Sequence, residues 1–152
     1  MVYSLGRTPE ELAETGARVG SDVPALVLAQ HYRRPILMEG RGERVSLLPA
    51  EPSRPLVLAN PGVFSSTPEV FRAWRPNDSV NQLQPAAVRL HPEIGAAIDA
   101  LADLGALEPR MTGSGATVFG FTRDDDEAGR IAAAMESRGF LAWKGRTHGG
   151  LD

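Results

Sequence analysis

Apolar residues recur at helical spacing in several parts of the chain, most clearly in residues 92–105. Ile94, Ile98, Leu101 and Leu104 lie three or four positions apart there, which places them on one face of a helix. This segment therefore predicts an amphipathic helix packed against a core. By the same reasoning, and from capping and proline signals, the other predicted helices are residues 9–19, 24–30, 67–74, 81–90 and 124–138.

Strand signals alternate with these helices. The continuous apolar run Pro55–Ala59 predicts a central strand, because a strand covered on both sides has no polar face. Residues 35–38 and 44–48 flank a turn with two glycines and predict a hairpin. The remaining expected strands are 116–121 and 140–143, followed by a loose tail at 144–152. This order predicts an α+β fold, with an antiparallel sheet and helices packed on one of its faces.

Capping residues and prolines mark where two of the N-terminal helices begin. Thr8 stands before Pro9, and two glutamates follow in the first turn, where carboxylates favour the positive end of the helix dipole. The next helix opens at Pro24, and Ser21 or Asp22 is its expected cap. A capping role is thus one interpretation of Asp22.

Composition narrows the class of protein. The chain has 152 residues, enough for about one domain with its own core, and a net charge of −3 from 16 basic and 19 acidic residues. This balance gives no footprint for a nucleic acid or an anionic membrane, and no apolar run reaches the roughly 18 residues that span a bilayer. The chain contains no cysteine, and its three histidines are far apart, so we expect no metal site. The only lysine is Lys144, which leaves few candidates for a phosphate-binding lysine.

A glycine-rich turn, Gly113-Ser114-Gly115, precedes the apolar run 116–121. Backbone without Cβ atoms approaches an anionic group closely, so such a turn is able to cradle a phosphate. The same residues also suit a plain turn between two strands. The three residues alone favour the plain turn.

Four segments occur in one order along the chain: GSDVP at 20–24, EGRGERVSLLP at 39–49, LVLANPGVFSSTPEVFRAW at 56–74 and MTGSGATVFGF at 111–121. Together they resemble the C-terminal half of the GHMP kinase superfamily, and most of all the 4-diphosphocytidyl-2-C-methyl-D-erythritol kinases. NQLQPAAVRLHPEI, at 81–94, is similar to a linker helix of the same kinases. The resemblance extends from about Leu5 to Trp143. It implies a ferredoxin-like C-terminal domain.

The resemblance also implies an activity, the ATP-dependent phosphorylation of the 2-hydroxyl of 4-diphosphocytidyl-2-C-methyl-D-erythritol in the cytoplasm, with Mg2+ as the accompanying ion. Asp22 matches the catalytic base, which needs a carboxylate within reach of the attacking hydroxyl. Thr67 and Phe71 match positions that line the substrate pocket, with Phe71 against the cytosine ring. An aromatic residue beside Val70 is, however, often a core residue. The hairpin at 39–43 is expected beside that pocket, or else as a solvated turn.

The cofactor-binding residues that the resemblance implies are Gly113, Ser114 and Gly115, which match the third glycine-rich motif of the family. No segment resembles the family's N-terminal lysine or its main ATP phosphate loop. We therefore expect residues 1–30 to be a remnant of the N-terminal kinase domain, with the catalytic aspartate, and residues 31–152 to be the C-terminal domain. The chain alone is expected to be inactive, as a truncated product or as one half of a two-chain enzyme with a separate N-terminal-half partner.

Two other interpretations remain open at this stage. The chain resembles other GHMP kinases, such as homoserine or mevalonate kinases, although the segments at 39–43 and 61–71 favour the first assignment. A second possibility belongs to another class of protein. It is a stand-alone ferredoxin-like module that binds a small ligand or a partner chain and performs no chemistry, because the lysine and the phosphate loop are missing.

Overall fold

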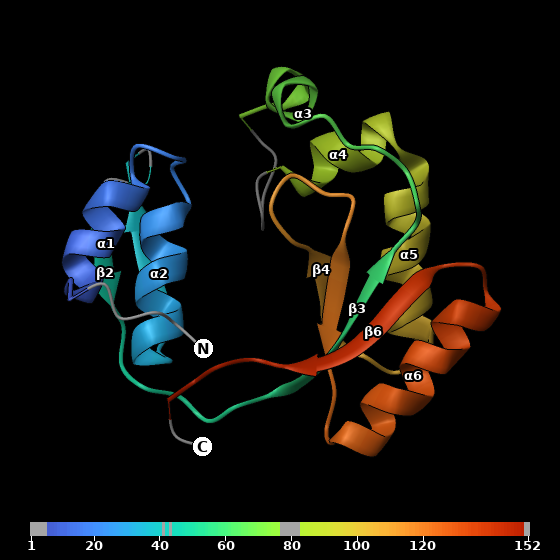
Figure 1. Ribbon diagram of the computed structural model, residues 1–152. Coiled ribbons are helices and arrows are strands. Elements are labelled where there is room, and N and C mark those ends of the chain that lie inside the picture. Colours follow the sequence, from blue (N-terminus) through green and yellow to red (C-terminus); the bar gives the residue numbers. More distant parts are fainter. Residues whose placement is uncertain (1–5, 41, 43, 77–82, 151–152) are drawn as a thin grey trace. The chain divides into compact units, whose positions relative to one another are not determined.

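The computed structural model describes residues 6–40, 42, 44–76 and 83–150. The chain divides into two compact units. Unit 1 consists of Met1–Ser53 and His148–Asp152, and unit 2 consists of Arg54–Thr147. Figure 1 shows the chain from blue at its N-terminus to red at its C-terminus.

Unit 1 contains two helices and a hairpin. Helix α1 spans Pro9–Gly16 and helix α2 spans Val23–Tyr32, and the two pack against each other. Strands β1 (Ile36–Glu39) and β2 (Arg44–Leu47) form the predicted antiparallel hairpin, which contacts α2. The predicted start of α1 is confirmed, since the side chain of Thr8 accepts a hydrogen bond from the Glu11 amide in a capping box.

Unit 2 is built on a four-stranded antiparallel sheet in the order β4-β5-β3-β6. The strands are β3 (Pro55–Asn60), β4 (Leu107–Met111), β5 (Val118–Phe121) and β6 (Leu141–Arg146). The prediction of a central strand at Pro55–Ala59 is confirmed, because β3 pairs with a neighbour on each side. Leu58, for example, lies opposite Phe119 of β5 and Trp143 of β6.

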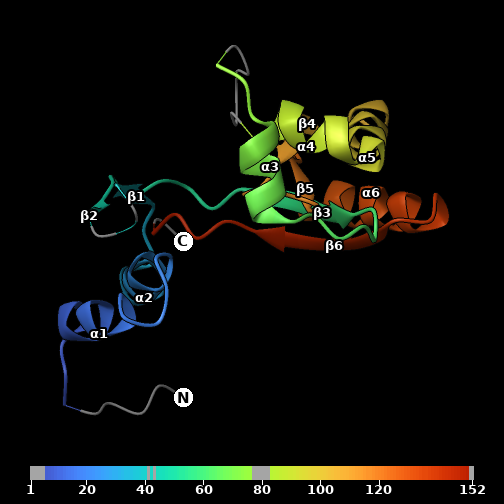
Figure 2. The same ribbon diagram turned by 90° about the horizontal axis from the view of Figure 1, so that it is seen from above.

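The helices of unit 2 are α3 (Thr67–Ala73), α4 (Gln84–Leu90), α5 (Pro92–Asp103) and α6 (Asp125–Ser137). Helices α5 and α6 pack against the sheet, as Figures 1 and 2 show from two directions. Val57 and Ala59 of β3 are fully buried and belong to the same cluster as Ile94, Leu101 and Ile131 of these helices. The predicted α+β fold with an antiparallel sheet is therefore confirmed.

One strand of this sheet was not predicted. Strand β4 contains Pro109, which has no N–H group, and Glu108, whose φ of 50° lies in the left-handed region. The register with β5 shifts between Leu107 and Arg110 at the same place. An edge strand interrupted in this way has no alternating pattern that a sequence-based analysis detects.

The prediction of a loose tail at 144–152 is wrong for the residues that the structure describes. Strand β6 continues to Arg146, and the Thr147 amide donates to the Arg54 carbonyl at 2.9 Å. The Glu51 amide donates to the Gly149 carbonyl at 2.7 Å. These are pairings between segments about 90 residues apart, which local patterning does not reveal; residues 151–152 lie outside the described part.

The predicted domain boundary and the boundary between the compact units do not coincide. The sequence divides the chain after residue 30, by resemblance, whereas the chain contacts divide it after Ser53 and group the hairpin with α1 and α2. The assignment of residues 1–30 to an N-terminal kinase domain stays a prediction. The first two residues of the helix expected at 81–90 lie outside the described residues.

Candidate functional site

The predicted site residues fall in both units. Asp22 lies in unit 1 at the start of α2. Thr67, Phe71 and the glycine turn lie in unit 2, where α3 and the connection between β4 and β5 carry them. In Figure 1 this connection is the orange loop above β4, and α3 is the green helix.

Asp22 occupies the N-cap position of α2, but its side chain makes no capping hydrogen bond. Its φ and ψ of −88° and −14° are helical rather than extended, which differs from the usual cap geometry. Pro24 also lacks the N–H group that a cap would bind in the second helical position. One oxygen of Asp22, Oδ1, accepts a hydrogen bond from Ser21 Oγ at 3.2 Å. Because the carboxylate is exposed and does not cap the helix, it is available to a ligand.

The turn of the β1–β2 hairpin lies close to the segment before Asp22. A Cβ atom on Gly42 would approach the carbonyl oxygen of Ser21 to 2.1 Å, and Gly42 has a φ of 101°. Only glycine tolerates both that contact and that conformation. The predicted hairpin is therefore packed beside the catalytic-base candidate of unit 1. Arg41 and Glu43 of the same turn lie outside the described residues.

The glycine turn closes β4 onto β5. The amide of Thr112 donates to the Thr117 carbonyl at 3.0 Å, and the amide of Gly115 donates to the Thr112 carbonyl at 3.1 Å. The Gly115 amide is thus used inside the turn and is not available to a phosphate. Gly113 and Gly115 have positive φ values of 58° and 90°, which explains why glycine stands at both positions.

The two glycines differ in what surrounds them. A Cβ on Gly113 would meet nothing within 4 Å, so that side of the turn is open. A Cβ on Gly115 would lie 2.9 Å from Met111 Sδ and 3.2 Å from Ile94 Cδ1. One side of the turn is therefore packed on the core of unit 2, while the other is accessible to a ligand.

Ser65, Thr67 and Ser114 bring the glycine turn and the start of α3 together. Thr67 Oγ1 and Ser114 Oγ are hydrogen-bonded at 2.6 Å. Ser65 Oγ donates to the carbonyl oxygen of Ser114 at 2.8 Å. A predicted substrate-binding residue and a predicted cofactor-binding residue, which are 47 positions apart, are thus in direct contact. The sequence analysis missed Ser65, because a hydroxyl residue just before a helix is typical of a cap.

Phe71 points its side chain to solvent rather than into the core. Its exposed fraction is 61%, whereas its neighbour Val70 is fully buried. The interpretation of Phe71 as a core residue is therefore wrong. Phe64, on the loop between β3 and α3, is exposed as well, and no sequence signal distinguished it. An exposed aromatic ring such as that of Phe71 is able to stack on a planar base.

The surroundings of the glycine turn are open on one side. Gly113 leaves an open approach, but the single lysine, Lys144, lies in β6 opposite Val57. Among the described residues, no three carboxylate or histidine side chains are grouped as a metal site would need. The part of this region that is open to a ligand is therefore the side of the turn at Gly113.

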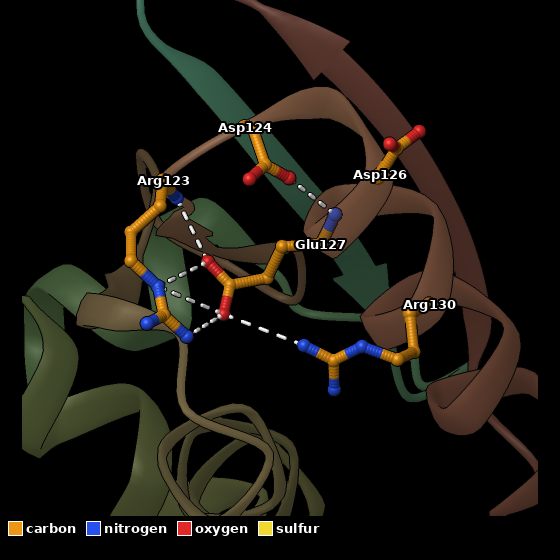
Figure 3. A pocket seen from close by; sticks show the side chains of 5 residues that line it. All are labelled: Arg123, Asp124, Asp126, Glu127 and Arg130. Atoms are coloured by element: carbon orange, nitrogen blue, oxygen red, sulfur yellow. Dashed lines mark hydrogen bonds and ion pairs between the residues drawn. The ribbon is translucent and has the colours of Figure 1, made fainter.

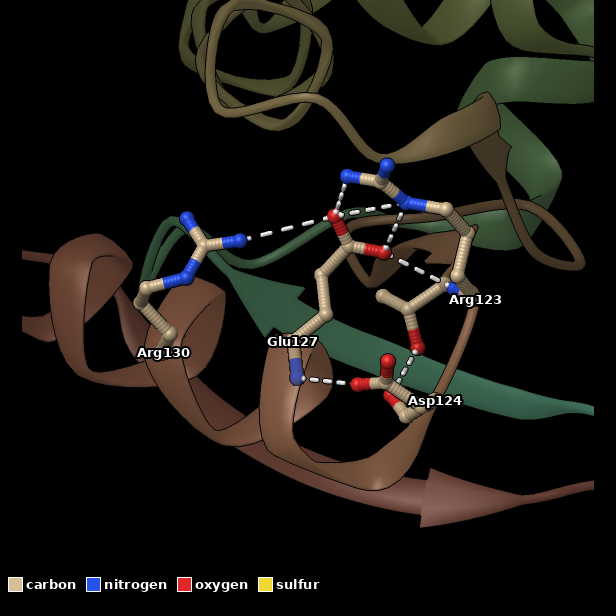
Figure 4. Close-up of polar contacts among 5 residues, drawn as sticks. Arg123, Asp124, Glu127 and Arg130 are labelled. Atoms are coloured by element: carbon tan, nitrogen blue, oxygen red, sulfur yellow. Dashed lines mark hydrogen bonds and ion pairs between the residues drawn. The ribbon is translucent and has the colours of Figure 1, made fainter.

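A second polar cluster surrounds the start of α6 (Figures 3 and 4). It lines a hollow of about 390 Å³ and consists of Arg123, Asp124, Asp126, Glu127 and Arg130. Glu127 is only 5% exposed and pairs with both arginines. The hydrogen bond from the Arg123 side chain, with that from the Arg123 amide, lowers the pKa of Glu127 from 4.5 to about 2.

The geometry of this cluster indicates a structural role. The Asp124 side chain accepts the Glu127 amide at 2.7 Å and caps α6, and the Glu127 carboxylate holds the Arg123 amide at 2.8 Å. Arg123, Asp124 and Glu127 bind one another and stabilise the start of the helix, which is a structural role. Three carboxylates against two arginines also give no surplus of positive charge for a phosphate.

Hollows flank helix α2 in unit 1. One, of about 640 Å³, is lined by Leu26, Ala29, Gln30, Arg33, Arg34 and His148. Another, of about 400 Å³, is lined by Glu10, Ala13, Glu14, Ala17, Pro24, Leu28 and Val45. The apolar residues of α2 are not confined to one face of the helix, and the side chain of one of them, Leu26, is 66% exposed. Helices of this composition are usually covered on every face.

A separate finding concerns the membrane. Within the described residues, the structure contains no helix with the length and apolar character that crossing a bilayer requires.

Comparisons with known proteins identify the family of this chain. Residues 60–140 match the family model described as GHMP kinases C terminal. The chain is 36% identical to 4-diphosphocytidyl-2-C-methyl-D-erythritol kinase of Granulibacter bethesdensis, over 95% of this chain and 55% of the relative. It is 35% identical to the kinase of the same name of a Geobacter species, over 96% of this chain and 58% of the relative. The chain thus spans little more than half the length of the curated relatives it matches.

Solved structures give a similar result. A crystal structure of 4-(cytidine 5'-diphospho)-2C-methyl-D-erythritol kinase superposes with a TM-score of 0.81 at 31% identity, over 91% of this chain and 57% of that protein. Homoserine kinase from Cytophaga hutchinsonii superposes with a TM-score of 0.69, over 97% of this chain and 61% of that protein. At 16% identity, this second likeness concerns the fold alone.

Proposed function

Since this chain belongs to the GHMP kinase C-terminal family, we propose that it contributes the substrate side of an ATP-dependent kinase that phosphorylates the 2-hydroxyl of 4-diphosphocytidyl-2-C-methyl-D-erythritol. The observation that supports this most is the 2.6 Å hydrogen bond between Thr67 and Ser114. The two residues come from different segments of the chain and were assigned separately to substrate and nucleotide. Their contact is what a site shared by both ligands requires.

In this proposal Phe71 stacks on the cytosine ring. The exposed ring of Phe71 lies on the first turns of α3, the helix that begins at Thr67. Stacking of a base on an aromatic ring contributes about 1–3 kcal/mol and tolerates the exposure seen here. Thr67 contributes a hydroxyl group that binds the methylerythritol part of the substrate.

Asp22 acts as the general base. A carboxylate that is exposed, unused as a cap and oriented by Ser21 is suited to accept the proton of the attacking hydroxyl. Phosphoryl transfer depends mostly on positioning and on stabilisation of charge on the transferred group. The described residues supply the base and the substrate contacts but few of the cations that this charge needs.

We further propose that these 152 residues alone transfer no phosphoryl group. Lys144 is the only lysine and belongs to the sheet of unit 2, so it does not replace the lysine of the family's N-terminal half. That half, on the same or on a separate polypeptide, would complete the site in the cytoplasm. Val19 and Leu26, which are exposed on either side of Asp22 in the sequence, are the apolar residues expected to contact it.

A second candidate function is a binding module without catalysis. The observation that favours it is the partial fit to ATP, since the Gly115 amide is occupied and no grouped metal ligands occur in the described residues. Such a module would bind the cytidine compound and leave it unchanged. It would use Phe71 and Thr67 in the same way.

The assay that tests the proposal supplies the purified chain with ATP, Mg2+ and 4-diphosphocytidyl-2-C-methyl-D-erythritol and follows ADP release. We expect no release by the chain alone, and release when the N-terminal half of the Granulibacter relative is added. Asp22→Asn in the reconstituted mixture should then lower the rate by at least about 100-fold, the contribution typical of a general base. Robust turnover by the chain alone would contradict the claim of inactivity. An unchanged rate with Asp22→Asn would contradict the role of Asp22.

A further inference from the structure

Ser114 is held through two different groups by two residues of one neighbouring segment. Its backbone carbonyl accepts the Ser65 hydroxyl at 2.8 Å, and its side chain shares a hydrogen bond with Thr67 at 2.6 Å. Ser65 and Thr67 both stand at the start of α3, whereas Ser114 is the middle residue of the glycine turn. The turn is therefore fixed to the helix that carries the proposed substrate contacts.

The side of the turn at Gly115 is tightly packed and has little room to move. Gly115 is packed against Met111 and Ile94, and the Cβ position of Gly115 is also 3.3 Å from Ser65 Oγ. Its amide is bound to the Thr112 carbonyl. Because Gly115 is packed on the core, the part of the turn that is able to move is the part around Ser114. The hydroxyl groups of Ser65 and Thr67 bind Ser114 and therefore fix the position of the open side of the turn.

The hydrogen bond between Thr67 Oγ1 and Ser114 Oγ forms with either hydroxyl as the donor. Each hydroxyl carries one proton, and one of the two protons is used in the bond between them. When Thr67 donates to Ser114, the Ser114 proton is free to bind an anionic oxygen, and Thr67 is free to accept from a hydroxyl of another molecule. When Ser114 donates, these roles are reversed.

We propose that Ser65 is a positioning residue and that the Thr67–Ser114 pair forms a hydrogen-bond relay across the site. Ser65 fixes the backbone of Ser114, and the relay then runs from a hydroxyl of the substrate through Thr67 to Ser114 and on to a phosphate oxygen of the nucleotide. Each ligand favours the direction that the other needs, so the two bind cooperatively. The identity of these two ligands rests on the proposed function, whereas the role of Ser65 does not.

Amide hydrogen exchange tests the positioning role without any ligand. The protected Gly115 amide reports opening of the turn. Ser65→Ala removes one hydrogen bond, so we expect this amide to exchange about 3- to 10-fold faster, the range that corresponds to a typical net hydrogen-bond contribution. Ser65→Thr keeps the hydroxyl and should restore slow exchange. Ser66→Ala is the matched control, because Ser66 makes no capping bond.

The exchange rate of the Gly115 amide distinguishes a positioning role of Ser65 from the absence of one. Faster exchange in Ser65→Ala alone, at an unchanged melting temperature of the sheet, is the expected result. Equal exchange in Ser65→Ala and Ser66→Ala would overturn the positioning role.

Calorimetric titration tests the relay. The affinity of the reconstituted two-part enzyme for 4-diphosphocytidyl-2-C-methyl-D-erythritol should rise about 5-fold or more when a non-hydrolysable ATP analogue is present, within the usual range of coupling between sites. Thr67→Val, which keeps the shape but loses the hydroxyl, should abolish that rise. A rise that persists in Thr67→Val would overturn the relay. Failure of the wild type to bind either ligand would contradict the proposed function and the relay together, while the exchange result still decides the role of Ser65.

Discussion

Unit 2 buries large apolar side chains, whereas the buried residues described in unit 1 are all small or cyclic. In unit 2, Ile94, Leu101, Ile131 and Met135 are fully buried between the sheet and its helices. In unit 1, the buried residues among those described are Ala13, Gly16, Pro24, Gly42 and Gly149. The two units are thus stabilised in different ways, although each contains two or more packed helices.

The difference bears on function. Burial of large side chains supplies most of the stability of a small domain, so unit 2 has what a self-supporting domain needs. Unit 1 depends on close backbone contacts at its glycines and on the cap of α1, and it carries the proposed base Asp22. The proposed binding groups therefore lie on the well-packed unit, and the candidate catalytic carboxylate lies on the unit with little core of its own.

The largest effect expected from this comparison is a matched pair of leucine truncations. Leu101→Ala in unit 2 should lower the free energy of unfolding by about 2–5 kcal/mol, because it leaves a cavity in a closed core. Leu26→Ala in unit 1 should change it by less than about 0.5 kcal/mol, because that side chain is mostly exposed. Urea unfolding followed by tryptophan fluorescence measures the loss in unit 2, where both tryptophans, Trp74 and Trp143, lie, and hydrogen exchange of the α2 amides measures the loss in unit 1. Similar losses in the two variants would refute the contrast.

A smaller effect is expected in the glycine turn. Gly115→Ala should destabilise unit 2 by about 2–3 kcal/mol, because the new Cβ meets Met111 and Ile94 at a positive φ. Gly113→Ala, with open space around it, should cost only about 1 kcal/mol, from the backbone conformation alone. Thermal unfolding of both variants checks the difference. If Gly113→Ala proved the more damaging, the open and packed sides of the turn would be wrongly assigned.

The acid response of unit 2 should depend on Glu127. The pKa of Glu127 is lowered to about 2 in the folded state from 4.5, so its contribution to stability is complete above about pH 4.5 and is lost as the pH falls towards 2. Glu127→Gln should therefore flatten part of the decline in melting temperature between pH 4.5 and 2. Glu136→Gln, an exposed residue of the same helix, is the control for loss of a carboxylate. Equal pH profiles for the wild type and Glu127→Gln would contradict the ion-pair assignment.

The smallest effects concern the helix caps, one in each unit. Asp124→Ala removes the cap of α6 and should lower the stability of unit 2 by about 1 kcal/mol. Thr8→Ala removes the cap of α1 and should leave the fluorescence-detected unfolding of unit 2 unchanged, while amides of α1 exchange faster. Hydrogen exchange of both variants shows which unit each substitution destabilises. Loss of unit 2 stability in Thr8→Ala would show that the two units unfold as one.

Sequence patterns within a short stretch of chain predicted the helices and strands whose formation depends on that stretch alone. The helical period of residues 92–105, the cap signal at Thr8 and the apolar run of β3 were all sufficient, and the structure confirms each. Strand β4 and the end of β6 were missed, because an interrupted edge strand and a distant backbone pairing leave no periodic signal. Their positions depend on the tertiary structure.

In the candidate site, too, some features were predicted from the sequence and others required the structure. Thr67 and Ser114 were identified as members of known motifs, but their mutual contact required the fold. Ser65 was missed, because its hydroxyl binds the glycine turn, 49 positions away in the sequence, and local patterns do not reveal such a contact. The side chain of Asp22 was expected to cap α2 in one interpretation, and the missing N–H of Pro24 helps to explain why it does not.

The central claim is that unit 2 carries the substrate side of the site, and calorimetric titration of the chain with 4-diphosphocytidyl-2-C-methyl-D-erythritol tests it most directly. The account predicts saturable binding that is weakened about 10-fold by Phe71→Ala, through loss of base stacking, and unchanged by Trp143→Ala, an exposed aromatic of β6. Absence of binding, or equal weakening by both substitutions, would contradict the claim.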